Sequence, residues 1–73
     1  MKEKDSIRGC LQIIFDKLKP GEEFSGLWLH DMVAELNNKY TYTYPDTILR
    51  CARKYFRDSF RVKNTRKSIY EKI

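Results

Sequence analysis

The segment from Thr43 to Lys67 places the strongest constraint on the fold, because it joins an amphipathic helical pattern to a basic, strand-like tail. Between Asp46 and Phe56 apolar residues recur at helical spacing, with basic residues between them. The apolar set is Ile48, Leu49, Ala52, Tyr55 and Phe56, and the basic set is Arg50, Arg53, Lys54 and Arg57. At about 100° per residue, the mean directions of the two sets lie roughly 150° apart around the helix axis. We therefore expect one buried face and one charged face.

The positive charge of the chain is confined to its C-terminal part. Residues 1–45 contain six basic and seven acidic residues, a net charge of −1. Residues 46–73 contain nine basic and three acidic residues, a net charge of +6. This asymmetry predicts a polyanionic partner, with DNA or RNA first and an acidic protein or anionic lipid second.

The length and composition predict one small globular domain. A chain of 73 residues has room for one core, so we treat residues 1–73 as a single domain. Hydrophobic residues make up 41% of the chain, which is too many for a disordered segment. The N-terminal residues lead into no long apolar run, so we expect neither a signal peptide nor a membrane span. We therefore expect the protein to be cytoplasmic.

The chemically reactive residues argue against catalysis and against a bound metal. Cys10 and Cys51 are 41 residues apart, no CxxC pair is present, and His30 is the only histidine. We therefore expect reduced thiols, no metal site and no cofactor. The sequence shows no glycine-rich phosphate loop and no recognisable grouping of Ser, His and Asp, so we do not expect an enzyme.

A first helix is predicted from the apolar period between Ile7 and Leu18, with Asp5 or Ser6 as its N-cap. The sequence Lys19-Pro20-Gly21 ends this helix, because proline disfavours a helical residue before it and glycine permits a turn. Phe24 then lies between polar neighbours in residues 22–25. We expect this segment to form at most a one-bridge strand at a sheet edge.

A second helix is predicted to start after Ser25, a suitable N-cap, and to carry Trp28 beside its apolar stripe. That stripe consists of Leu29, Met32, Val33 and Leu36. Asn37-Asn38 ends the helix, since asparagine tolerates the left-handed conformation found at many helix ends. Residues 40–44 alternate tyrosine and threonine. Because helical patterns flank them, we expect an extended connection rather than a strand.

The third helix is predicted to start within Thr43-Tyr44-Pro45-Asp46, which has capping-box spacing and a proline suited to a first helical turn. Either Thr43 or Tyr44 serves as the cap, and the helix runs to about Arg57 or Asp58. We expect the Asp46 side chain to complete the cap of this helix rather than to contact a DNA base.

A β-hairpin is predicted after the third helix. Residues 60–63 alternate apolar and basic side chains, residues 64–67 are turn formers, and residues 68–73 form the return strand. The pattern leaves open which face of the return strand points inward, because Ile69 and Tyr70 point to opposite sides.

This order of elements resembles that of winged helix-turn-helix domains. The residues that carry the resemblance are Phe24–Leu36, Tyr44–Arg50 and the hairpin Phe60–Ile73. The resemblance implies an α+β fold, a three-helix winged-helix domain with a small C-terminal β-hairpin, the wing. It further implies that the helix at about 44–57 enters the major groove, while the wing at about 60–73 contacts the neighbouring backbone or minor groove.

The resemblance places candidate DNA-binding residues in two groups. The recognition-helix group is Thr43, Asp46, Thr47, Arg50, Arg53, Lys54 and Arg57, and the wing group is Lys63, Asn64, Arg66 and Lys67. We expect Arg50 to read bases, and Arg57 and the wing residues to contact phosphates. The connection before Thr43 is longer than the tight turn typical of the family, and the wing is short.

The predicted function is therefore that of a small DNA-binding protein, a transcriptional or DNA-transaction accessory factor whose main partner is double-stranded DNA. One alternative is a protein-interaction module, in which the basic face docks on an acidic protein or the Trp28 region forms an interface. Another is binding of single-stranded DNA or RNA through Tyr40, Tyr42 and Tyr44. A second copy of the chain is a further possible partner, since one recognition helix covers few base pairs.

Overall fold

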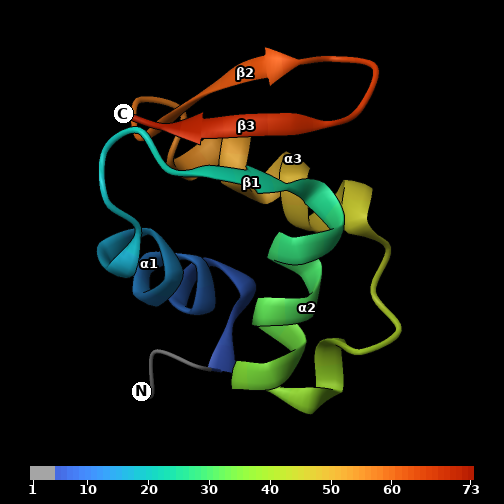
Figure 1. Cartoon of the computed structure of the whole chain (residues 1–73). Coiled ribbons are helices and arrows are strands. Elements are labelled where there is room, and N and C mark those ends of the chain that lie inside the picture. Colours follow the sequence, from blue (N-terminus) through green and yellow to red (C-terminus); the bar gives the residue numbers. More distant parts are fainter. Residues whose placement is uncertain (1–4) are drawn as a thin grey trace.

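The computed structural model describes residues 5–73 and contains three α-helices and a three-stranded antiparallel sheet (Figure 1). The elements are α1 (Ile7–Lys17), β1 (Glu23–Ser25), α2 (Gly26–Leu36), the short 3₁₀ helix η2 (Asn38–Tyr40), α3 (Pro45–Tyr55), β2 (Phe60–Asn64) and β3 (Ile69–Lys72). The predicted α+β class is thus confirmed. The first four residues of the predicted single domain lie outside the described residues.

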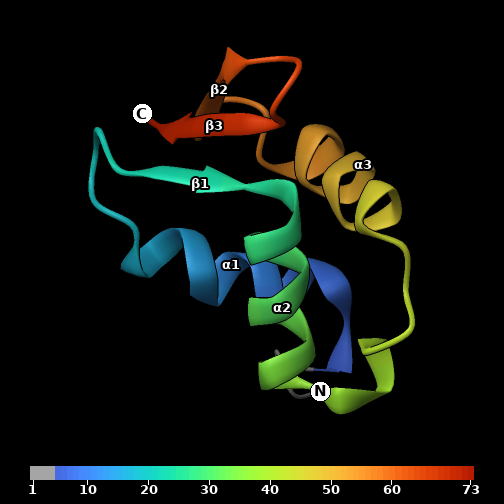
Figure 2. The same ribbon diagram turned by 45° about the vertical axis from the view of Figure 1, so that its right-hand side comes forward.

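The sheet has the order β1-β3-β2, so the last strand of the chain lies in the centre. Figure 2 shows β1 running directly into α2, with the sheet on one side of the helices. Strand β1 pairs with β3 at three positions, of which Phe24 opposite Tyr70 is the middle one. The prediction of at most one bridge was wrong, because the partner strand comes from a distant part of the sequence that a local pattern does not show.

Of the two predicted caps of α1, Ser6 is the one used, and its side chain accepts from the N–H of Gly9. The predicted Ser25 cap of α2 is confirmed, since its side chain accepts from the N–H of Trp28. Helix α2 ends after Leu36 as predicted, but for a different reason. Asn37 is extended, with a φ of −151°, rather than left-handed. Its side chain accepts from the N–H of Lys39 and starts η2. The connection before α3 therefore begins with a helical turn instead of being extended throughout.

The predicted capping box at the start of α3 is absent. Tyr44 is the N-cap and makes no side-chain cap hydrogen bond, and Pro45 occupies the first turn. The helix ends at Tyr55, so Arg57 lies beyond it in the turn formed by residues 57–59. The ring of Phe56 packs at 5.2 Å from that of Phe15, and Phe56 leaves helical geometry at a φ of −131°. The prediction that the helix reaches Arg57 was therefore wrong.

The core joins an aromatic cluster under the sheet to an aliphatic cluster between the helices. Phe15, Phe24, Phe56, Phe60 and Tyr70 form the aromatic cluster, and the aliphatic part contains Leu11, Ile14, Leu29, Val33, Ile48, Leu49 and Ala52. Tyr70, not Ile69, faces inward on β3, at 3% exposure. Tyr55, predicted to be buried, is 44% exposed. Residue 55 is the last residue of α3, and its ring is approached by the cations of Arg8 and Lys54.

Candidate nucleic-acid interface

Helix α3 has a buried side and an exposed side, as its amphipathic pattern predicts. Ile48, Leu49 and Ala52 are buried, whereas Thr47 and Arg50 are exposed. The exposed residues Thr47, Arg50 and Lys54 are three and four positions apart, so they lie along one face of the helix. Arg50 therefore points away from the core.

A close approach between α2 and α3 fixes the position of this helix. The first residue of α2, Gly26, lies directly against Leu49 of α3: a methyl group at Gly26 would lie 2.8 Å from Leu49 Cδ1. The glycine thus leaves room for the Leu49 side chain, which would have to shift if residue 26 carried a methyl group. With Leu49 pressed against the start of α2, the opposite face of α3 stays directed outward despite the long connection before it.

Arg53 links α3 to the sheet. Its Nη2 donates to the hydroxyl of Tyr70 at 3.0 Å in a partly buried contact. Tyr70 is the inward-facing residue of the central strand. The hydrogen bond therefore joins α3 to the central strand, and it engages one of the predicted DNA-binding arginines in the fold itself.

Four charged side chains form a ladder of ion pairs across the strands. Arg61 donates to Glu71 at 2.7 Å, and Lys63 lies 2.5 Å from a carboxylate oxygen of Glu23 and 3.8 Å from one of Glu71. The hydrogen bond from Arg61 lowers the pKa of the Glu71 carboxyl, and that from Lys63 to Glu23 raises the pKa of the Lys63 ammonium. Lys63, a predicted phosphate contact, is thus already neutralised by acidic residues of the chain.

The turn between β2 and β3 carries the cations that the ladder leaves unpaired. The Asn64 side chain accepts from the N–H of Lys67 at 3.1 Å, and Ser68 takes a positive φ of 52° to close the turn. Arg66 and Lys67 are both exposed, and within residues 5–73 neither forms an ion pair with a carboxylate. Asn64 therefore has a structural role, and Arg66 and Lys67 remain available to a ligand.

The hairpin turn and the start of α3 meet at a shared pocket of about 240 Å³. Arg66 and Lys67 line it from the turn, Asp46 from α3, and Leu27 from α2. The structure thus brings three of the predicted site residues together at the point where helix and hairpin adjoin. Thr43 and Arg57 lie outside both α3 and the hairpin: Thr43 is half-buried in the connection, and Arg57 is exposed in the turn after α3.

Sequence reasoning missed Arg8, which extends the basic surface onto α1. Its guanidinium carbon lies 4.6 Å from the centre of the Tyr55 ring, and Lys54 Nζ lies 5.3 Å from the same centre. No signal in the sequence marks Arg8, because it belongs to the half of the chain with a net charge of −1.

Nearby Cys51 is half-buried, and its burial raises the thiol pKa more than Lys54 and Arg8 lower it. This favours the unreactive protonated thiol.

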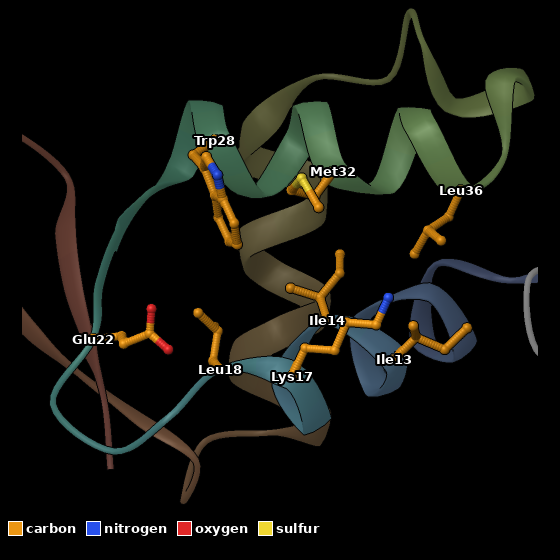
Figure 3. Close-up of a pocket in the computed structure, with 8 residues that line it drawn as sticks. All are labelled: Ile13, Ile14, Lys17, Leu18, Glu22, Trp28, Met32 and Leu36. Carbon is orange, nitrogen blue, oxygen red and sulfur yellow. The ribbon is translucent and has the colours of Figure 1, made fainter.

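A separate apolar pocket of about 210 Å³ lies between α1 and α2. Trp28 of α2 points toward α1 and Ile14 of α1 points toward α2, with Glu22 at one end of the pocket and Leu36 at the other (Figure 3). Trp28 is 37% exposed. This pocket contains none of the predicted DNA-binding residues.

Within residues 5–73, no group of three or more His, Cys, Asp or Glu side chains is placed to hold a metal ion. No helix in this part of the chain is both long and apolar enough to cross a membrane. Comparisons with protein-family models, curated proteins and solved structures found no match to this chain.

Proposed function

We propose that the protein is a winged-helix-like domain that binds double-stranded DNA through α3 and the β2–β3 hairpin. In this role it acts by binding alone, as an accessory factor in transcription or another DNA transaction. The order of the elements supports the proposal, since three helices, an early short strand and a C-terminal hairpin are what the resemblance implies. So does the antiparallel sheet, in which that early strand joins the hairpin.

The observation that carries the proposal is the distribution of unpaired cations. Acidic residues of the chain neutralise Arg61 and Lys63 in the strands. Among the described residues, by contrast, no ion pair with a carboxylate involves Arg50 on α3 or Arg66 and Lys67 in the hairpin turn. A surface that leaves its positive charges unpaired at two adjoining sites is suited to a polyanion such as duplex DNA.

The chemistry of the two sites suggests different tasks. Arg50 lies on the exposed face of α3 one turn after Thr47, and an arginine can donate two hydrogen bonds to O6 and N7 of guanine. Lys67 and Arg66 lie on a turn beside the start of this helix, where they suit the phosphates flanking a groove. Helix α3 is thus the proposed reader of sequence, and the hairpin turn the proposed backbone contact.

We expect binding to a fluorescently labelled duplex, followed by anisotropy, to weaken steeply with salt. If α3 and the hairpin turn neutralise about four phosphates, the slope of log K against log [salt] is about −3.6. The affinity then falls by roughly 100-fold between 50 and 200 mM salt. A flat salt response, or no binding at low salt, contradicts the proposal.

Two lysines of the hairpin provide a matched comparison for this titration. Lys67→Ala and Lys63→Ala each remove one positive charge, but Lys67 has no acidic partner among the described residues, whereas Lys63 is paired with Glu23 and Glu71. We expect Lys67→Ala to make the slope less steep by about 1 and Lys63→Ala to leave it nearly unchanged. Equal changes in slope would mean that net charge alone governs binding.

A further inference from the structure

Two tyrosines on the connection before α3 project almost entirely into solvent. Tyr42 is 95% exposed and Tyr44 is 79% exposed. Within the described part of the chain, no hydrogen bond or ring contact is found for either side chain. Tyr40, in the same connection, differs: its hydroxyl donates to the carbonyl of Asp5 at 2.8 Å, and its ring packs against the core. The exposure is therefore particular to Tyr42 and Tyr44, and the folded structure provides no use for either ring.

Tyr44 occupies a position where a smaller polar residue would stabilise the helix. It is the N-cap of α3 and makes no side-chain cap hydrogen bond. Serine, threonine, asparagine or aspartate at an N-cap typically contributes about 1 kcal/mol more than a residue without a capping side chain. Helix stability thus gives no reason for a tyrosine here.

The spacing of residues aligns Tyr44 with the proposed recognition face. Thr47 follows Tyr44 by three positions, and Arg50 follows Thr47 by three. Residues three apart are neighbours on a helix surface, so Tyr44 stands at the start of the exposed row that leads to Arg50. A nucleic acid held by that row would meet the Tyr44 ring at the N-terminal end of α3, and Tyr42 precedes Tyr44 by two residues in the chain.

We propose that Tyr42 and Tyr44 stack on unpaired bases, so that the preferred ligand is DNA in which a duplex adjoins a single-stranded segment. The inference rests on the proposed binding of duplex DNA by α3. Every base has an aromatic face, and stacking on exposed aromatic rings beside positive charge is a general mode of single-strand recognition. A phosphate contact would need only the hydroxyl group, whereas here both whole rings are exposed.

Three labelled DNAs test this inference by anisotropy at one salt concentration: a blunt duplex, the same duplex with a short single-stranded overhang, and the overhang sequence alone. We expect the wild-type protein to bind the overhang duplex about tenfold more tightly than the blunt duplex. The double variant Tyr42→Ala, Tyr44→Ala is expected to abolish this difference. Its thermal unfolding, followed by circular dichroism, verifies that it is folded.

The double variant Tyr42→Phe, Tyr44→Phe is the matched control, because it keeps the rings and removes only the hydroxyl groups. We expect it to retain the preference for the overhang. Loss of the preference in this variant would assign the contact to the hydroxyl groups and overturn the stacking proposal. Equal wild-type affinity for the two duplexes, or for the overhang alone and the overhang duplex, would overturn it as well. Failure to bind either duplex would instead contradict the proposed function.

Discussion

Replacing Phe24 with alanine is expected to lower the free energy of unfolding by about 3–5 kcal/mol. Phe24 is 4% exposed, and its ring centre lies within 5.7 to 6.1 Å of the ring centres of Phe15, Trp28, Phe60 and Tyr70. The substitution removes the central member of the aromatic cluster and leaves a cavity between the sheet and α1. A domain of this size has a total stability of only about 3–5 kcal/mol, so folded and unfolded molecules should be present in comparable amounts at 25 °C.

Urea denaturation followed by circular dichroism measures this loss. Tyr42→Ala is a suitable control, because it removes an aromatic side chain that is 95% exposed and should change the stability by less than about 0.5 kcal/mol. If Phe24→Ala and Tyr42→Ala had similar effects, the aromatic cluster would not be the main support of the sheet.

Arg50→Ala is expected to cost about 1–3 kcal/mol at a preferred DNA site, which is roughly 5- to 150-fold in affinity, and to affect unrelated sequences much less. The reason is that Arg50 is the exposed arginine nearest the N-terminal end of α3, where it is placed to reach base edges. Lys67→Ala should instead weaken binding to all sequences alike, because a lysine on the hairpin turn contacts only the backbone in the proposed complex.

The measurement compares affinities of both variants for a site selected from random-sequence duplexes and for an unrelated duplex. The ratio of the two affinities should fall for Arg50→Ala and stay constant for Lys67→Ala. If both variants changed the ratio equally, the division of tasks between α3 and the hairpin turn would be wrong.

The helices were predictable from the sequence because their signals are local. Ser6 and Ser25 cap α1 and α2, and the apolar period of α3 marks its buried face. The pairing of β1 with β3 was underestimated, since it joins residues more than forty positions apart. The end of α3 was misplaced because the packing of Phe56 on Phe15, a tertiary contact, decides where the helix stops.

The candidate site was also predictable only where its features depend on local sequence. The exposure of Thr47 and Arg50 follows from the amphipathic pattern and is present in the structure. The neutralisation of Lys63 was not predictable, because its partner Glu23 is 40 residues away in the sequence. Arg8 was missed for the same reason: only the fold places α1 beside the end of α3.

The most direct measurement of the central claim is an NMR titration of the protein with duplex DNA that follows backbone amide shifts. The proposed interface predicts shifts at residues 46–54 of α3 and at residues 64–68 of the hairpin turn. Residues that line the apolar pocket between α1 and α2 serve as the internal control and should not shift. Shifts confined to α1 and α2, or no shifts at all, would contradict DNA binding by α3 and favour a protein-interaction module instead.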